Sequence, residues 1–233
     1  MKIKTIKTRI FKPSENLIKF IEDYLPEIKE ETVLLITSKI VALSEGRLVK
    51  ISGDKEKVEL IKKESDFCVR SKYAYITIKD GMVMASAGVD ESNAQGNIIL
   101  LPKDSFVTAS KVRNYFIKKY KIKKLAVIIT DSRSMPLRKG ITGSALGYAG
   151  FSALKDYCKS LDIFGRPFKH SIVNVADSLA TSAVLCMGEG SERRPLAIIK
   201  KVPIEYVDKI NRGELLVNIK DDMYGPIFRA KLK

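Results

Sequence analysis

The segment that decides the fold reads Leu125-Ala-Val-Ile-Ile-Thr130-Asp131-Ser132. Its opening run, 125–130, is mostly apolar and rich in β-branched residues, which is typical of a strand buried inside a sheet. An acid and a hydroxyl follow directly, so the rigid end of the strand holds their oxygen atoms where a ligand can approach. A basic loop, Arg133 to Lys139, comes next, and then Gly140-Ile-Thr-Gly143.

Oxygen ligands of this kind suit Mg²⁺ or Mn²⁺, which keep several waters and take one or two carboxylates together with substrate phosphates. Asp131 in front of a basic loop therefore suggests a metal-bound phosphate. The alternative is that Asp131 and Ser132 only cap the turn after the strand, because Asp and Ser are common turn residues. The local sequence is compatible with both interpretations.

Composition narrows the class of protein. The chain has 233 residues, 45% hydrophobic and 30% charged. That length can bury a substantial core, in one large domain or two modest ones. No apolar run approaches the roughly 20 residues that cross a bilayer. The basic N-terminus has no apolar stretch behind it that would make a signal peptide, so we expect a cytoplasmic protein without a membrane partner.

Cysteine and histidine usage narrows the kind of metal site. Cys68, Cys158 and Cys186 are widely spaced and form no Cys-x-x-Cys pair. This argues against a zinc site or a disulfide framework and fits a reducing compartment. His170 is the only histidine, which excludes a multi-histidine centre, and a single His is more often packed or exposed than catalytic. Any metal must therefore bind to oxygen atoms.

The formal net charge is +15. Such a charge attracts nucleic acid, anionic lipid or small polyanionic substrates. The lysines are spread along the chain, apart from a cluster at 118–124, and a solvated basic surface accounts for them equally well. A nucleic-acid-binding protein remains an alternative, although no binding motif supports it.

Hydrophobic periodicity predicts strands and helices over most of the chain. Strands are predicted at 1–7, 32–37, 73–78, 82–85, 98–101, 125–130, 171–175 and 196–199. Helices are predicted at 15–24, 38–44, 55–65, 105–120, 143–159 and 176–187. Small residues at 144, 145, 147 and 150 would let the helix at 143–159 pack closely on a sheet or on a second subunit. The tail from Asp208 receives no assignment.

Three acids, Asp90, Asp131 and Glu189, each follow the end of a predicted element, but their spacing cannot show that they meet. The segments 133–138 and 193–194 supply arginines that can bind nucleotide phosphates. A helix is predicted to start at Ser38-Lys39, and the free backbone N–H groups at its start can bind an anion. The alternative is an ordinary strand-to-helix turn with a surface lysine. The glycine-rich signatures of P-loop and dinucleotide-binding proteins are absent.

Several motifs occur in a consistent order. They are Ile36-Thr-Ser-Lys-Ile-Val41 with Ser44-Glu-Gly-Arg47, Ala85-Ser-Ala-Gly-Val-Asp-Glu-Ser-Asn93, Ile128-Ile-Thr-Asp-Ser132, Asp162-Ile-Phe-Gly-Arg166, Val175-Ala-Asp177 and Met187-Gly-Glu-Gly190. Together they resemble the coenzyme F420-0:L-glutamate ligase family, the γ-glutamyl ligases, over about residues 5 to 200.

The resemblance implies a GTP-dependent ligase that joins the amine of L-glutamate to the carboxylate of a small anionic acceptor through an acyl phosphate. It implies two Mg²⁺ or Mn²⁺ ions, with GTP as co-substrate. The implied fold is α+β with a mixed sheet and two intimately associated subdomains, in an intertwined homodimer. One domain would cover 1–233, with a possible smaller subdomain within about 65–165.

Residue roles follow from the same resemblance. Asp90 and Asp131 would bind metal, with Ser132 and Glu189 on a second ion. Asp131 and Arg138 would be catalytic. The nucleotide would be held by Ser38, Lys39, Asn93, Met187, Gly188, Gly190, Ser191, Arg193 and Arg194.

The sequence departs from the family pattern at three places. Leu43 stands where family members often have a lysine, and Lys39 is the nearby substitute. The segment Arg133-Ser-Met-Pro-Leu-Arg138 replaces the usual Gly-Arg-Pro-Trp-Arg, and Ser178 follows Asp177 where a glutamate is common. These positions are where an acceptor would bind, so a folate or other pterin acceptor remains an alternative to F420-0. A nucleotide-binding protein without catalysis also remains open.

Overall fold

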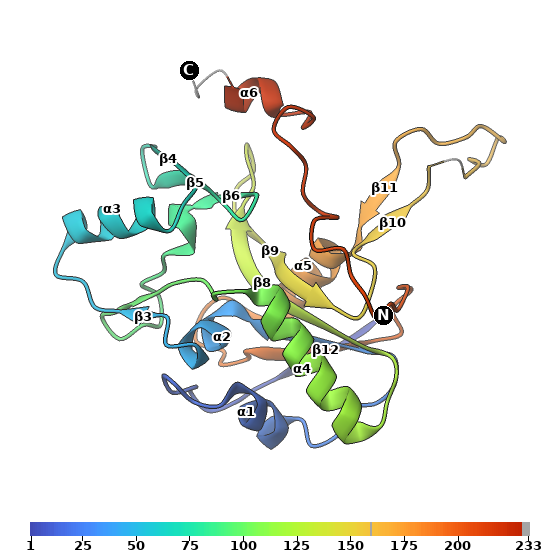
Figure 1. The fold of residues 1–233 in the computed structure, drawn as a ribbon, viewed down its shortest axis with the longest axis horizontal. Coiled ribbons are helices and arrows are strands. Elements are labelled where there is room, and N and C mark those ends of the chain that lie inside the picture. The colour runs from blue at the N-terminus through green and yellow to red at the C-terminus, as the bar shows by residue number, and fades with distance from the viewer. Residues whose placement is uncertain (159, 230–233) are drawn as a thin grey trace.

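A five-stranded mixed sheet lies at the centre of the molecule (Figure 1). The computed structural model describes residues 1–158 and 160–229. Its strands are β1 (Lys2–Ile6), β2 (Thr32–Thr37), β3 (Leu48–Val49), β4 (Phe67–Arg70), β5 (Tyr75–Lys79), β6 (Met82–Ala85), β7 (Ile98–Ile99), β8 (Leu125–Ser134), β9 (Ile141–Ala149), β10 (Leu154–Asp156), β11 (Ile172–Asn174) and β12 (Leu196–Lys200). Its helices are α1 (Leu17–Tyr24), α2 (Ser38–Ser44), α3 (Asp54–Lys63), α4 (Ser105–Tyr120), α5 (Val175–Met187) and α6 (Gly225–Arg229), with a 3-10 turn at Ser86–Gly88. The α+β class with a mixed sheet is confirmed.

The central sheet has the strand order β1-β12-β2-β8-β9. Strands β2 and β8 run parallel, with Thr37 opposite Thr130, and the other neighbouring pairs in this sheet are antiparallel. The apolar residues of β2 and β8 are buried because elements cover both faces of the sheet. The predictions of buried strands at 32–37 and 125–130 are therefore confirmed.

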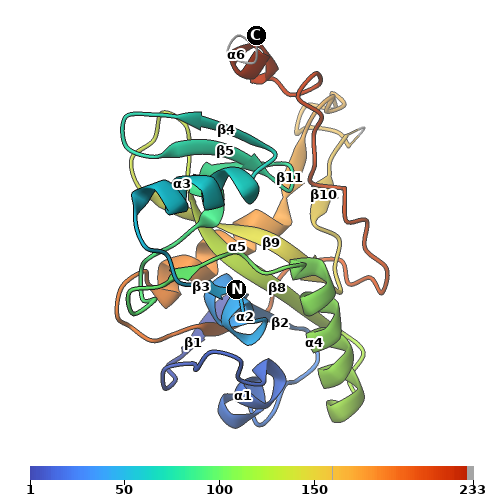
Figure 2. The ribbon, with the colours of Figure 1, turned by 60° about the vertical axis from the view of Figure 1, so that its left-hand side comes forward.

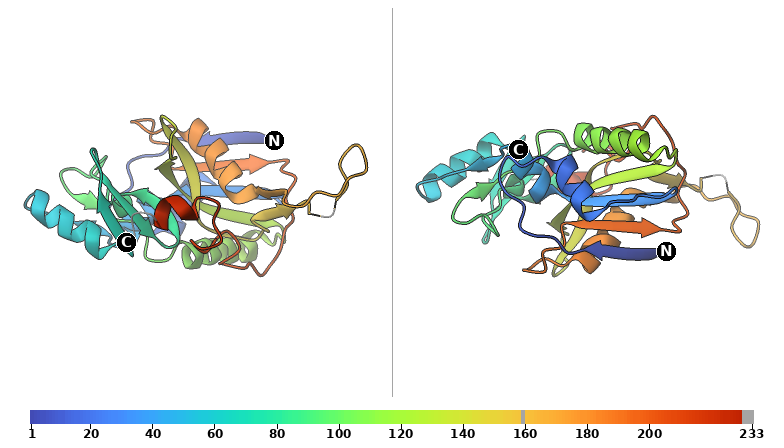
Figure 3. Two further views of the ribbon diagram at one scale, coloured as in Figure 1. Left: turned by 90° about the horizontal axis from the view of Figure 1, so that it is seen from above. Right: turned by 90° about the horizontal axis from the view of Figure 1, so that it is seen from below.

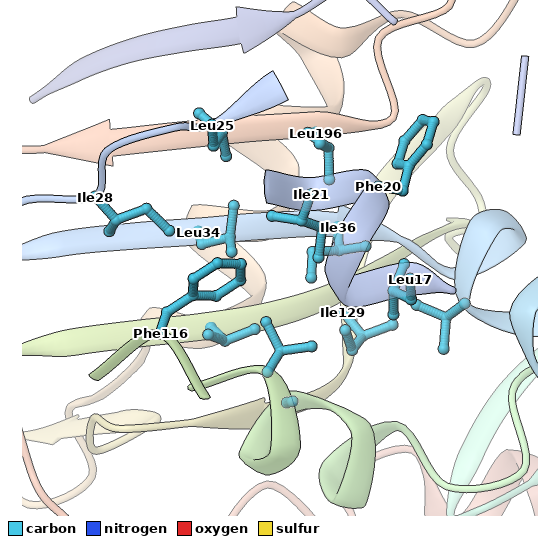
Figure 4. Close-up of a cluster of buried hydrophobic side chains, with 14 of the residues drawn as sticks. Leu17, Phe20, Ile21, Leu25, Ile28, Leu34, Ile36, Phe116, Ile129 and Leu196 are labelled. Carbon is cyan, nitrogen blue, oxygen red and sulfur yellow. The ribbon is translucent and has the colours of Figure 1, made fainter. Parts of the chain in front are cut away.

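Each face of the sheet has its own apolar cluster, because alternate residues of a strand point to opposite sides. Leu34 and Ile36 pack with Phe20 of α1 and Phe116 of α4 (Figure 4). Leu35 faces the other side, where α5 covers the sheet. A fully buried side chain of this size stabilises the fold by about 1.5–3 kcal/mol, so the two clusters fix the orientation of α1, α4 and α5.

A smaller layer, formed by α3 and the antiparallel sheet β4-β5-β6, extends beyond the central sheet (Figure 2). The strands predicted at 73–78 and 82–85 are confirmed, and they pair as a hairpin. Its turn residues, Asp80 and Gly81, have φ angles of 51° and 75°, which a two-residue turn of this kind requires. Glu64, just after α3, accepts from Arg47 at 2.7 Å and from Lys79 at 2.9 Å and so ties the layer together.

Two segments extend from the body of the protein. Strands β10 and β11, with the described residues 157, 158 and 160–171 between them, form an arm that projects away from the sheet (Figure 3). The C-terminal segment 202–217, called the strap here, runs back along the molecule. The Tyr148 hydroxyl of β9 donates to Glu214 of the strap at 2.7 Å, and Arg212 donates to Asp104 at 2.6 Å. Leu216 then contacts Gly81 in the β5–β6 turn.

Most element boundaries differ from the predictions by a few residues. The first helix begins at Leu17 rather than at residue 15, because the Asn16 side chain caps it by accepting from Lys19 N at 3.0 Å. Asp104 caps α4, accepting from Val107 N at 2.9 Å. The strand predicted at 98–101 pairs only at Ile98–Ile99. Within the described residues, no helix is both long and apolar enough to cross a membrane.

The predicted helix at 143–159 is wrong. Residues 141–149 form β9, the edge strand paired with β8, and Lys159 lies outside the described residues. The small residues allow close packing, as expected, but they belong to a strand that packs against helices rather than to a helix. A Cβ added to Gly143 would lie 2.6 Å from Ala180 O of α5, whereas one on Gly147 would lie 2.5 Å from Phe106 N of α4. A β-bulge between these glycines turns them to opposite faces, which removes the simple alternation that identifies a strand.

We expect Gly147→Ala to destabilise the protein by about 1–3 kcal/mol, because the added methyl meets backbone atoms of α4 that cannot move aside. In a helix the same change would stabilise by up to about 1 kcal/mol. The free energy of unfolding, measured by denaturant titration, checks the sign. Gly53→Ala is the control: its added methyl meets nothing within 4 Å, and we expect a change below about 1 kcal/mol. A stabilised Gly147→Ala variant would contradict the observed packing.

Candidate active site

Two adjoining cavities open at the edge of the central sheet where the parallel strands β2 and β8 run toward the smaller layer. The first, about 290 Å³, is lined by the carboxylates of Asp90, Asp131 and Glu189 and is called the acidic cavity here. The second, about 560 Å³, is lined by Arg9, Arg193 and Arg194 and is called the arginine cavity. The two cavities share five lining residues: Lys39, Ile99, Asp131, Ser132 and Glu189.

Asp131 lies inside β8, which continues to Ser134, so the interpretation of Asp131 as a turn cap is wrong. Its Oδ1 atom accepts from the Ser38 hydroxyl at 3.0 Å, across the β2–β8 pairing. Burial raises the pKa of Asp131 to about 6, against the lowering effect of the Ser38 and Ser132 hydrogen bonds. The hydrogen bonds to Asp131 do not fully compensate for the loss of hydration of its carboxylate, so a cation bound there would stabilise the charged form.

Asp90 reaches the same cavity from the smaller layer. The 3-10 turn Ser86–Gly88 precedes it, and an isolated β-bridge to Ile99 fixes its backbone. Oδ2 lies 2.5 Å from Lys39 Nζ, and Oδ1 accepts from Ser92 N at 2.7 Å. Burial raises the pKa of Asp90, but the contacts with Lys39 and Ser92 outweigh it, so the pKa lies below its ordinary value.

Glu189 enters the cavity from the loop that follows α5. The Ser132 hydroxyl donates to Glu189 Oε1, which links the end of β8 to this loop. Asp90, Asp131, Ser132 and Glu189 thus line one cavity although they come from three distant segments. The three acids, whose spacing in the sequence could not show that they meet, therefore line the same cavity.

The donor set suits Mg²⁺ or Mn²⁺, because it consists of carboxylate and hydroxyl oxygens. As the side chains stand, however, no three His, Cys, Asp or Glu residues within 1–158 and 160–229 cluster closely enough to hold a metal ion. In this arrangement the Lys39 ammonium contacts Asp90. The residues fit the chemistry of a divalent cation and would have to rearrange to bind one.

The predicted nucleotide residues lie mostly around the arginine cavity. Its lining includes Lys39, Asn93, Met187, Gly188, Gly190, Ser191, Arg193 and Arg194. Ser38 instead lines the acidic cavity, and its hydroxyl is engaged with Asp131. Arg138 lies in the loop between β8 and β9 and is absent from the lining of both cavities. Its catalytic role stays a prediction.

Sequence reasoning missed the segment Thr8–Phe11, which also lines the arginine cavity. Arg9 contacts Glu15 and Phe20, with Nη1 at 2.9 Å from Glu15 Oε2. The hydrogen bond from Arg9 lowers the pKa of Glu15 to about 2. An arginine just after an edge strand carries no motif, so only the position of β1 beside β12 could have identified it.

Asp177 joins the elements that position the site. Its Oδ1 accepts from Ala145 N at 2.8 Å, next to the bulge at which Leu146 has no partner in β8. Its Oδ2 accepts from Arg133 at 3.0 Å and from Asn174, the N-cap of α5, at 2.9 Å. Asp177 therefore fixes the end of β8 and the start of the helix that leads to Glu189.

Comparison with known proteins places these features in context. The family model described as F420-0:Gamma-glutamyl ligase matches residues 5–201. The chain is 34% identical over 233 residues to a coenzyme F420:L-glutamate ligase of Methanocaldococcus jannaschii, covering 91% of this chain and 92% of the relative. It is 33% identical to proteins of the same name from Methanococcus maripaludis strain C7, covering 84% and 86%, and from Methanopyrus kandleri, covering 82% and 83%.

These relatives are all ligases, and the protein is an enzyme of that class, one that forms amide bonds. More particularly, the chain belongs to the F420-0:gamma-glutamyl ligase family, as the resemblance of its motifs indicated.

We expect Asp177→Ala to destabilise the protein by about 2–4 kcal/mol, because Ala145 N–H and the half-buried Arg133 lose their partner. Ser178→Ala is the control, since its exposed hydroxyl only donates to Asn174 O and its loss should cost below about 0.5 kcal/mol. Denaturant unfolding of the two variants provides the comparison, and equal stabilities would rule out the structural role of Asp177.

Proposed function

We propose that the protein adds L-glutamate to the carboxylate of a small anionic acceptor of the coenzyme F420-0 kind, using GTP and a divalent cation. The observation that carries the proposal is the junction of the two cavities at Asp131, Ser132 and Glu189. There a cavity lined by carboxylates, which would suit cations, adjoins one lined by arginines, which would suit phosphates, in a chain whose family and relatives are glutamate ligases.

The reaction would run in two steps. An acceptor carboxylate oxygen attacks the γ-phosphorus of GTP, GDP leaves, and an acyl phosphate forms. The amine of glutamate then attacks the acyl carbon, inorganic phosphate leaves, and the amine loses a proton to give the amide. The first step makes the carboxylate electrophilic, which an amine needs in order to react with it at neutral pH.

Different residues would bind the cations, the GTP phosphates and the acceptor. Asp90, Asp131, Ser132 and Glu189 would hold two Mg²⁺ or Mn²⁺ ions, which supply neutralisation of the charge on the phosphoryl group as it transfers. Arg193 and Arg194 would bind GTP phosphates, because guanidinium groups match phosphate oxygens in pairs. The loop that carries Arg138 leads into β9 at Ile141, which lines the acidic cavity, so we place the acceptor on this side.

We expect Asp131→Asn to lower turnover by about a hundredfold or more, because the amide cannot hold a cation beside the transferring phosphate. Mass spectrometry detects glutamate addition to F420-0 and to pterin carboxylates, incubated with Mn²⁺ and either GTP or ATP. Asp54→Asn, at the exposed start of α3, is the matched control and should retain wild-type turnover. An Asp131→Asn variant that ligates at the wild-type rate would refute the metal role. If glutamate is added to a pterin carboxylate and not to F420-0, the acceptor in the proposal becomes a pterin.

We also propose that the protein is a homodimer whose arm packs on the second copy. The arm presents Ile163 and Phe164, which are 91% and 83% exposed, together with the exposed Leu161. Apolar side chains gathered on a projecting segment mark interaction surfaces in water. The family resemblance suggests the second copy as the occupant.

Replacing Phe164 with Asp should shift the protein from dimer toward monomer in size-exclusion chromatography with light scattering, because burying the new carboxylate in an apolar interface is costly. Tyr73→Asp is the control, since Tyr73 is similarly exposed at 87% but lies on the distant β4–β5 turn. A wild-type protein that is monomeric at micromolar concentration would contradict the dimer, and a Phe164→Asp dimer would contradict the role of the arm.

A further inference from the structure

We propose that Lys39 occupies the place of a divalent cation at Asp90 in the ligand-free protein and turns to the nucleotide phosphates when a cation binds. Cation and nucleotide would then bind cooperatively through this one side chain. The inference rests on the proposed function and adds a mechanism of coupling between its two ligands.

The position of Lys39 is the first support. It is the second residue of α2, which starts directly after β2, so its backbone is held at the edge of the sheet. Its Nζ atom lies 2.5 Å from Asp90 Oδ2 and bridges the central sheet to the smaller layer. The Lys39 side chain is 29% exposed, so it contacts Asp90 in a partly dehydrated setting where the charges interact more strongly than in water.

The charges of the acidic cavity are the second support. Asp90, Asp131 and Glu189 line it, and Lys39 is the only basic residue among its described lining residues. Without a cation, the lysine supplies the one positive side-chain charge among the described residues that line this cavity. A divalent cation at Asp90 would repel the ammonium at such short range, so both cannot stay there.

The third support is that Lys39 also lines the arginine cavity, together with Arg9, Arg193 and Arg194. A lysine side chain has four flexible methylene groups and a compact charge, so Nζ can move between neighbouring sites while its backbone stays fixed. Lys39 can therefore leave Asp90 and still be near a phosphate. Nucleotide bound in the arginine cavity gives the released ammonium a new partner.

This arrangement has a thermodynamic consequence. In the absence of nucleotide, a cation must displace Lys39 from Asp90, and its affinity is reduced accordingly. With nucleotide present, the displaced lysine gains a phosphate contact, so the affinity for the cation rises. The same factor must increase the affinity for nucleotide when the cation is present, because coupling between two ligands is reciprocal.

The test uses isothermal titration calorimetry of the full chain with MnCl₂ and GDP, which permits no turnover. The variant Lys39→Met keeps the length of the side chain and removes its charge. We expect it to bind Mn²⁺ alone about tenfold more tightly than the wild type, because the competing ammonium is gone. The factor by which saturating GDP strengthens Mn²⁺ binding should be about tenfold smaller in this variant than in the wild type, since only direct contact between Mn²⁺ and phosphate remains.

Lys57→Met is the matched control. Lys57 pairs with Glu91 at 2.7 Å, close to Asp90 in sequence, but it is not among the residues that line either cavity. We expect wild-type Mn²⁺ affinity and coupling for it. Unchanged or weaker Mn²⁺ binding by Lys39→Met, or an unchanged coupling factor, would overturn the inference and leave the proposed function standing. Failure of the wild type and both variants to bind Mn²⁺ would overturn both.

Discussion

The parallel pairing of β2 with β8 is the constraint on which the site depends. It sets Thr37 opposite Thr130, so the residue that follows each of them, Ser38 at the start of α2 and Asp131 in β8, reaches the same edge of the sheet. Their side chains hydrogen-bond across 93 positions of sequence. Because α2 begins at Ser38, the same pairing also positions Lys39 at this edge of the sheet. The continuation of β8 places the Ser132 hydroxyl in hydrogen-bonding distance of Glu189. A shift of one residue in this register would turn Asp131 to the other face of the sheet and separate these groups.

The parts of the fold that could be predicted from sequence are those with a regular apolar pattern. The interior strands β2 and β8 are continuous apolar runs, and α2 has the bounds that its strand-to-helix junction indicated. Strand β9 could not be predicted, because the glycines that admit α4 and α5 carry no β-propensity and the bulge interrupts their alternation.

The site was predictable as a set of residue types but not as a geometry. Acids that follow element ends indicated which segments carry oxygen ligands, and the motifs supplied the family. The interior position of Asp131 in a strand, the contact of Lys39 with Asp90 and the presence of Arg9 depend on which strands become neighbours. No local pattern encodes that choice. The acidic cavity is lined by carboxylates and the adjoining arginine cavity by guanidinium groups. This arrangement of charge is complementary to a cation paired with a phosphate.

The strap limits how far the polypeptide can be truncated at its C-terminal side. The family match ends at residue 201, yet Glu214 receives hydrogen bonds from the Tyr148 hydroxyl and from Ala153 N. Shortening the polypeptide to the matched region would leave a buried phenol and a backbone amide unsatisfied at the margin of the sheet. It would also release the β5–β6 turn from Leu216. The strap thus connects β9 to the β5–β6 turn, and a fragment that ends with the family match would lack it.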